Sequence, residues 1–130
     1  EDYAEMQWKI LQHPSPDDFV ISTGKQYSVK YFVIKCCDYL GIKLKWIGKG
    51  LNERAVIIKV NKQITPNLKI GSTIVKIDKK YFRPLDVDNL IGDSRKAHRK
   101  LNWKPKINIK KLISRMMDSD MALTKKLINN

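Results

Sequence analysis

The chain has 130 residues, of which 42% are hydrophobic, and a formal net charge of +13. This length suits one domain with a modest core, and the hydrophobic share excludes a disordered chain. No apolar run approaches the ~20 residues that a membrane-spanning helix needs, so no membrane role is expected.

The positive charge is unevenly distributed. Residues 1–24 contain five acidic residues and one lysine, so the other basic residues all follow them. A strongly basic domain usually indicates nucleic acid as a partner. Here the lysines are scattered over the polar sides of the predicted elements, which favours a solvated surface over a nucleic-acid site.

The two cysteines, Cys36 and Cys37, are adjacent. A disulfide between neighbours in a helix would be strained, and no His, Cys or carboxylate cluster has the spacing of metal ligands. We predict two reduced thiols on a half-buried helix and no metal site, which fits a cytoplasmic protein.

The first predicted element is a helix over residues 2–12. Asp2, with Glu5 three residues later, resembles a capping box, and Pro14-Ser15-Pro16 ends the helix. A short apolar strand is predicted at residues 19–21. One face of the helix is predicted to be buried through Ala4, Trp8 and Leu11.

A second helix is predicted to begin after Ser28 and to end at Gly41. Its apolar residues recur at helical spacing: Val29, Phe32, Val33, Cys36 and Leu40. Residues 42–46 alternate between apolar and basic, which predicts a half-exposed strand. Gly48-Lys49-Gly50 is predicted to be a turn, because it lacks the pattern of a phosphate-binding loop.

Residues 52–78 are predicted to form a β-hairpin insertion, because β-branched runs at 54–60 and 72–77 flank turn residues. A final helix is predicted from the apolar positions Ile109, Leu112, Ile113 and Met116, continuing to Leu123, Leu127 and Ile128. Short, partly antiparallel strands with helices predict a small α+β fold rather than a wound parallel sheet.

Arg83 and Asp86 are the candidate binding residues. Arg83 precedes a proline, which favours extended backbone, and its guanidinium suits phosphate or carboxylate. Asp86 could accept hydrogen bonds from hydroxyl groups or hold an arginine in place. From the residues alone, a surface salt bridge of little energetic value is an equally good interpretation of Arg83.

A helix with both ends marked follows this segment. Gly92-Asp93 predicts a turn and an N-cap, and Ala97 and Leu101 lie four residues apart on one face. Trp103 and Pro105 come just past the predicted end.

These motifs, in this order, resemble the C-terminal part of the GDP-mannose 4,6-dehydratases, a group within the extended short-chain dehydrogenase/reductase family. The resemblance covers nearly the whole chain. The motifs are Asp2-Tyr3, Met6-Gln7-Trp8, Thr23-Gly24, Tyr27-Ser28-Val29, Tyr81-Phe82-Arg83-Pro84, Gly92-Asp93, Lys96-Ala97 and Trp103-Lys104-Pro105.

The resemblance implies that residues 1–130 are one substrate-binding lobe, lacking most of the Rossmann domain. The complete enzyme would be a lyase of GDP-fucose biosynthesis that converts GDP-mannose to GDP-4-dehydro-6-deoxy-mannose and water. It would bind NADP in the upstream Rossmann domain and form a homo-oligomer. The absence of an initiator methionine fits a fragment, which alone is expected to be inactive.

The resemblance also implies roles for single residues. Arg83 would contact the diphosphate or ribose of the GDP-sugar, and Asp86 stands where the family usually has glutamate, so the ribose contact is weakened. The catalytic tyrosine and lysine would lie upstream, so this chain would hold no catalytic residue. Tyr31 and Lys35 match their spacing, which we interpret as coincidence.

The alternative hypothesis from composition is a free-standing basic module that binds RNA or DNA. Against it, the sequence has no RNP-like aromatic motif, no GXXG loop and no zinc-finger spacing.

Overall fold

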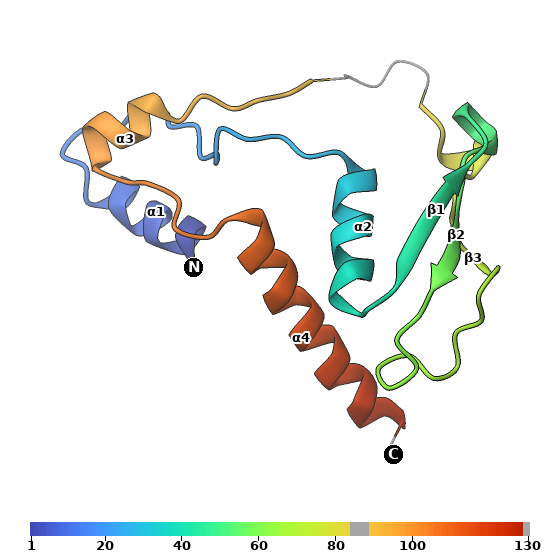
Figure 1. Cartoon of the computed structure of the whole chain (residues 1–130). Coiled ribbons are helices and arrows are strands. Elements are labelled where there is room, and N and C mark those ends of the chain that lie inside the picture. The colour runs from blue at the N-terminus through green and yellow to red at the C-terminus, as the bar shows by residue number, and fades with distance from the viewer. Residues whose placement is uncertain (84–88, 129–130) are drawn as a thin grey trace. The chain divides into compact units, whose positions relative to one another are not determined.

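The computed structural model describes residues 1–83 and 89–128 (Figure 1). Helices and a small antiparallel sheet make up this part of the chain, as the α+β prediction required. The elements are α1 (Asp2–Leu11), α2 (Val29–Tyr39), β1 (Lys43–Ile47), η1 (Gly50–Asn52), β2 (Arg54–Lys59), β3 (Thr73–Lys76), η2 (Lys79–Tyr81), α3 (Arg95–Leu101) and α4 (Ile109–Ile128). None of the described helices is both long and apolar enough to cross a membrane.

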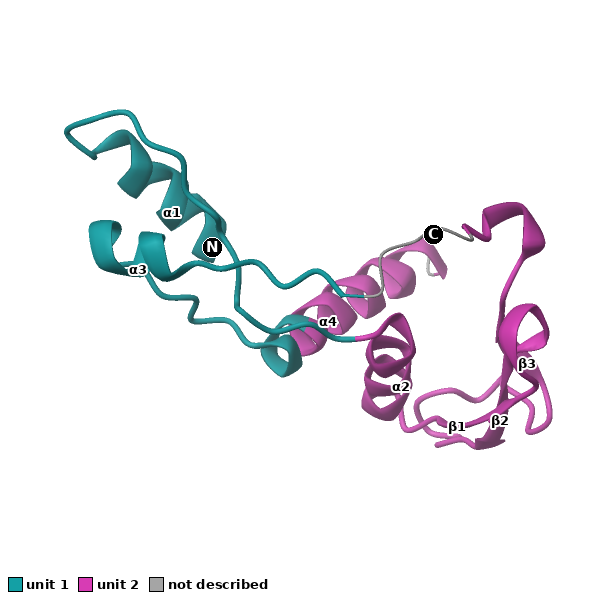
Figure 2. Ribbon diagram, turned by 90° about the horizontal axis from the view of Figure 1, so that it is seen from above, with its two compact units in different colours: residues 1–27, 87–112 teal, residues 28–86, 113–130 magenta. Residues whose placement is uncertain are grey.

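The chain divides into two compact units (Figure 2). Unit 1 comprises residues 1–27 and 87–112, and unit 2 comprises residues 28–86 and 113–130. The chain passes from one unit to the other three times, and the last change falls within α4, after Leu112. That residues 1–130 act as one substrate-binding lobe stays a prediction.

The core of unit 1 forms around Trp103, which is 1% exposed. Buried Met6, Ala97 and Leu101 share a cluster with this ring, and partly buried Ile10, Phe19 and Ile21 pack against the cluster. The indole Nε1 of Trp103 donates a hydrogen bond of 3.1 Å to the backbone oxygen of Asp2. The beginning of α1 and the segment after α3 are therefore joined by both apolar and polar contacts.

The predicted buried face of α1 is wrong. Trp8 and Leu11 are 61% and 80% exposed, whereas Met6 is fully buried. Met6 and Ile10 lie four residues apart and face the Trp103 cluster, which turns the side that carries Trp8 toward solvent. Both sides of this helix are apolar, so spacing alone could not decide between them.

Two further local predictions in unit 1 are also wrong. Residues 19–21 form no strand; Phe19 and Ile21 are apolar because they pack on the core cluster. Asp2 does not cap α1, whose N-cap is Glu1 without a side-chain hydrogen bond. The carboxylate of Asp2 instead accepts hydrogen bonds of 2.8 Å from the backbone N–H groups of Lys106 and Ile107.

Unit 2 contains α2 and the sheet, in the order β1-β2-β3 with both pairs antiparallel. The hydroxyl of Ser28 accepts a hydrogen bond of 3.0 Å from the backbone N–H of Tyr31, which confirms the predicted N-cap of α2. Alternate residues of β2 point to the interior. Ile57 is fully buried there, in a cluster with Cys37 and Ile42.

The two β-branched runs pair as predicted, with Ala55 of β2 opposite Val75 of β3. The predicted turn between β1 and β2 is also confirmed, because Gly48 and Gly50 both have positive φ angles, of 83° and 56°. That this hairpin is an insertion stays a prediction.

Candidate functional site

Arg83 lies in an exposed segment just after η2. Asp78 caps the start of η2, where its carboxylate accepts a hydrogen bond of 3.0 Å from the backbone N–H of Lys80. The rings of Tyr81 and Phe82 are 73% and 52% exposed. This segment therefore carries an exposed arginine directly after two exposed aromatic residues, and these residue types can contact phosphate oxygens and cover a ring of a ligand.

The second predicted binding residue, Asp86, lies outside the described residues 1–83 and 89–128. The pairing of Arg83 with Asp86 in one site therefore stays a prediction. Burial of Arg83 against protein would have contradicted a binding role, and its exposure is consistent with one.

A close backbone approach fixes the segment that leads into α3. A Cβ atom at Gly92 would lie 2.8 Å from the Cβ of Ser22, so a side chain does not fit there. The hydroxyl of Ser22 donates a hydrogen bond of 2.7 Å to the backbone oxygen of Gly92. Gly92 is thus required by packing on residues 20–22.

Asp93 was predicted to be the N-cap of α3, but that position belongs to Ser94. The carboxylate of Asp93 instead accepts hydrogen bonds from Arg95, at 3.0 Å from the backbone N–H and 2.6 Å from Nη2. These bonds from Arg95 lower the pKa of Asp93 to about 2. The sequence singled out Asp93 but did not predict its pairing with Arg95.

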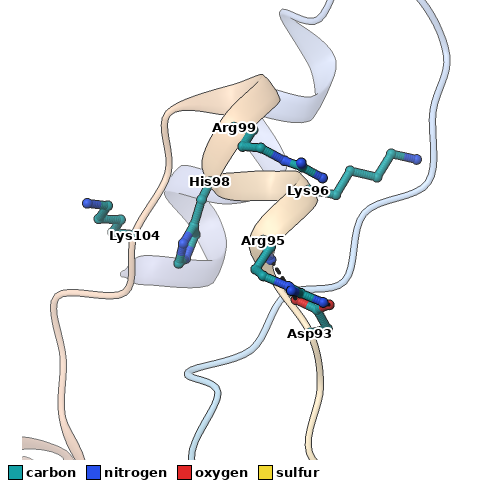
Figure 3. Close-up of a pocket in the computed structure, with 6 residues that line it drawn as sticks. All are labelled: Asp93, Arg95, Lys96, His98, Arg99 and Lys104. Atoms are coloured by element: carbon teal, nitrogen blue, oxygen red, sulfur yellow. Dashed lines mark hydrogen bonds and ion pairs between the residues drawn. The ribbon is translucent and has the colours of Figure 1, made fainter.

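Basic side chains surround a shallow basin of about 580 Å³ beside α3 (Figure 3). Only one of its six lining residues is acidic. They are Asp93, Arg95, Lys96, His98, Arg99 and Lys104. In Figure 3, Arg95 points to Asp93, whereas His98 and Lys104 extend away from that pair. Two of the basin's charges are compensated, because Arg95 pairs with Asp93 and Lys96 pairs with Asp17.

Asp17 connects residues 12–24 to α3. Its carboxylate forms ion pairs with Lys96 and with Lys100, whose Nζ lies 2.7 Å from Oδ2. Hydrogen bonds from Lys100 and Lys96 hold the pKa of Asp17 well below its usual range. The two lysines stand four residues apart on α3 and about 80 residues from Asp17, so no local pattern predicted this connection.

This connection predicts a specific loss of stability in acid. Because the pKa of Asp17 is lower in the folded chain than its ordinary 3.8, its stabilising contribution is complete above that value and disappears as the pH falls through the folded pKa. We expect Asp17→Asn to lower the urea midpoint of unfolding at pH 7. In acid, where Asp17 of the wild type becomes protonated, the midpoints of variant and wild type should lie closer together. Asp18→Asn removes the same charge from the neighbouring position and serves as the control. An unchanged difference between pH 7 and acid would contradict the role of Asp17.

Asp2 positions the segment that follows α3. Burial raises the pKa of this carboxyl, but the N–H groups of Ile107 and Lys106 and nearby positive charges lower it by more. Lys106 also pairs with Glu5 through its side chain, at 2.5 Å. The path of the chain from Trp103 to α4 is therefore set by the first turns of α1.

The other titratable groups among residues 1–83 and 89–128 show no arrangement typical of a reaction centre. Within the part of the chain that the structure describes, no three His, Cys, Asp or Glu side chains gather to hold a metal ion. The Nζ of Lys35 lies 5.6 Å from the ring centre of Tyr31 and forms an ion pair of 3.6 Å with Asp38. These are contacts between residues three or four positions apart, as on any helix surface. That the catalytic pair lies upstream stays a prediction.

Comparison with known proteins gives a consistent result. A family model described as GDP-mannose 4,6 dehydratase matches residues 1–116. A GDP-mannose 4,6-dehydratase of Vibrio cholerae serotype O1 is 44% identical over 121 residues, which cover 93% of this chain and 32% of the relative. The corresponding protein of Yersinia enterocolitica is 40% identical over 125 residues, covering 96% and 34%. That of Homo sapiens is 39% identical over 123 residues, covering 95% and 30%. The chain thus spans about a third of the length of these relatives.

Proposed function

The chain belongs to the GDP-mannose 4,6-dehydratase family, and from that premise we propose that it is the C-terminal, GDP-sugar-binding part of such an enzyme. The complete enzyme would convert GDP-mannose to GDP-4-dehydro-6-deoxy-mannose and water, which is a carbon–oxygen lyase reaction. The observation that carries this proposal is the family match through residues 1–116, which includes the exposed Arg83.

Arg83 would hold the diphosphate of the substrate. Hydrogen bonds from a guanidinium to phosphate are charge-assisted, and two can form in parallel. Asp86 would accept hydrogen bonds from the ribose hydroxyls, with a shorter reach than the glutamate usual in the family. The exposed rings of Tyr81 and Phe82 would help to exclude water from this contact. The contribution of these residues is therefore binding and orientation of the substrate.

The residues of this chain do not fit the cofactor that we propose for the complete enzyme, NADP. A dinucleotide site needs a glycine-rich turn between a parallel strand and a helix. Gly48-Lys49-Gly50 leads instead into η1 and the antiparallel strand β2. When bound in an upstream Rossmann domain, NADP would supply hydride transfer. We assign no catalytic step to this chain and expect the 130 residues alone to be inactive. The complete enzyme is proposed to be a homo-oligomer.

Replacing Arg83 with alanine tests the proposed binding site. The chain alone is expected to bind GDP and GDP-mannose weakly, with a Kd of about 1 mM, because most of the enzyme is missing. Loss of a charge-assisted contact should weaken this binding roughly tenfold. Chemical-shift titration of the labelled chain with each ligand measures the change.

The matched control is Arg54→Ala, which removes an exposed arginine from β2 in the same unit. Its affinity for GDP should equal that of the wild type. Equal weakening in both variants would indicate general electrostatic attraction rather than a site at Arg83. A random oligonucleotide that binds with a steep salt dependence, without preference for guanine nucleotides, would contradict the proposed function.

A further inference from the structure

An ion pair joins the start of α2 to the start of β2 within unit 2. The Nζ of Lys30 lies 2.6 Å from Oε1 of Glu53, and the two side chains are 43% and 28% exposed. Lys30 is the second residue of α2, and Glu53 lies between η1 and β2. Because the two residues are 23 positions apart, the pair connects the helix to the sheet rather than stabilising a local turn.

The same lysine contacts the face of an indole in β1. Its Nζ lies 4.5 Å from the ring centre of Trp46, which is within the range of a cation–π interaction. The Nε1 atom of this ring is buried and has no hydrogen-bond partner in the described part of the chain. A lysine that meets a single carboxylate at the surface gains little stability, but Lys30 is held by two groups from different segments. Its position is therefore more restricted than that of an ordinary surface lysine.

Glu53 stands where the segment that carries Arg83 leaves the sheet. The backbone N–H of Glu53 donates a hydrogen bond of 3.0 Å to the oxygen of Gly50, and its backbone oxygen accepts one of 3.4 Å from the N–H of Ile77. Ile77 is the first residue after β3. The residue that Lys30 holds through its side chain thus holds the end of β3 through its backbone.

Further hydrogen bonds continue from Ile77 toward Arg83. The next residue, Asp78, caps η2 with its carboxylate, as described above. The backbone N–H of Phe82 closes the same turn with a hydrogen bond of 3.3 Å to the oxygen of Lys79. Arg83 follows directly. A displacement at Glu53 would therefore be carried along a short, hydrogen-bonded segment to the guanidinium.

We propose that the Lys30–Glu53 ion pair positions Arg83 for binding the diphosphate, without contact between the pair and the ligand. This inference rests on the proposed function of Arg83. A segment whose base is already held loses less conformational freedom when the ligand binds, so the affinity is higher. Loss of the pair should leave the fold intact, because neither residue belongs to the buried cluster of unit 2 around Ile57.

Opposite changes of charge at the two residues test the proposal. Direct attraction of GDP would be weakened by Lys30→Gln, which removes a positive charge, and strengthened by Glu53→Gln, which removes a negative one. Positioning predicts instead that both variants bind GDP roughly threefold to fivefold more weakly, the upper range for the loss of a partly exposed ion pair. Chemical-shift titration of the labelled 130-residue chain with GDP measures both affinities.

Two further variants separate positioning from a general structural effect. The double variant Lys30→Gln/Glu53→Gln should bind no more weakly than either single variant, because each single change already removes the pair. Lys30→Arg keeps the positive charge and should bind GDP like the wild type. Circular dichroism and urea unfolding establish that each variant is folded under the conditions of the titration.

The matched control is Lys43→Gln in the same unit. The Nζ of Lys43 forms an ion pair of the same length, 2.6 Å, with Asp38, whose side chain is also 28% exposed. Lys43 lies opposite Lys59, at the far end of β2 from Glu53. This variant changes the net charge as Lys30→Gln does, yet should bind GDP like the wild type. Amide hydrogen exchange at residues 77–82 should speed up in Lys30→Gln and Glu53→Gln but not in Lys43→Gln.

The outcomes separate the positioning role from the proposed function. Tighter binding by Glu53→Gln, or equal weakening by Lys30→Gln and Lys43→Gln, would overturn the positioning role, because charge alone would then explain the affinities. Unchanged affinity in Lys30→Gln and Glu53→Gln, with weaker binding by Arg83→Ala, would overturn the positioning role and leave the proposed function standing. Unchanged affinity in Arg83→Ala would overturn both.

Discussion

Replacing Trp103 with alanine is expected to lower the free energy of unfolding of unit 1 by about 3–5 kcal/mol. The indole is 1% exposed and lies at the centre of the cluster that joins α1 to α3. Alanine would leave a cavity beside Met6 and Leu101 and would remove the hydrogen bond from Nε1 to Asp2. A loss of this size is a large part of the stability of a small domain. Urea unfolding followed by helical circular dichroism measures it.

The matched control is Trp8→Ala, on the exposed side of α1. Because its side chain is 61% exposed, this substitution should change the free energy of unfolding by no more than about 0.5 kcal/mol. Equal destabilisation by the two substitutions would contradict the exposed position of Trp8 described above.

Replacing Gly48 with alanine is expected to disrupt the turn between β1 and β2. The residue has a φ angle of +83°, where side chains are strained, and an added Cβ would lie 2.3 Å from the backbone oxygen of Asn52. Neither a flexible side chain nor open space can absorb that overlap, so the backbone must move. Strain and displacement together should cost at least about 2–3 kcal/mol. Amide hydrogen exchange should speed up across β1 and β2.

Gly71→Ala separates the overlap from the effect of backbone conformation. Gly71 also has a positive φ angle, of +91°, but an added Cβ would meet nothing within 4 Å. Only the conformational strain remains, so the loss should be about 1 kcal/mol. A Gly48→Ala chain as stable as the Gly71→Ala chain would show that the turn accommodates a side chain by a small rearrangement.

The predictions that succeeded are those decided by neighbours in the sequence. The N-cap at Ser28, the hairpin of β2 and β3 and the long C-terminal helix depend on spacing and turn residues over a few positions. The buried face of α1 failed because the choice between Trp8 and Met6 depends on Trp103, far along the chain. The strand at residues 19–21 failed for the same reason, because Phe19 and Ile21 are apolar for that cluster and not for a sheet.

The same contrast between local and distant determinants applies to the residues of the candidate site. Arg83 is exposed, as expected of a charged residue in an extended segment before a proline. The two lysines that hold Asp17, and the two N–H groups that bind Asp2, come from segments 79 to 105 residues away. Contacts of that range leave no periodic signal, so only the three-dimensional arrangement reveals them.

The attachment of α1 to residues 103–107 has a consequence for synthesis. A ribosome makes α1 roughly 95 residues before Leu101 and Trp103, its partners in the buried cluster, which at ordinary elongation rates is a delay on the order of 5–20 s. The strands β1, β2 and β3 are made within that interval and can pair while α1 still lacks Leu101 and Trp103 as partners for Met6. Chaperones that recognise short apolar stretches would therefore meet this helix on the translating ribosome, and slower elongation before the codon for Trp103 would lengthen that encounter.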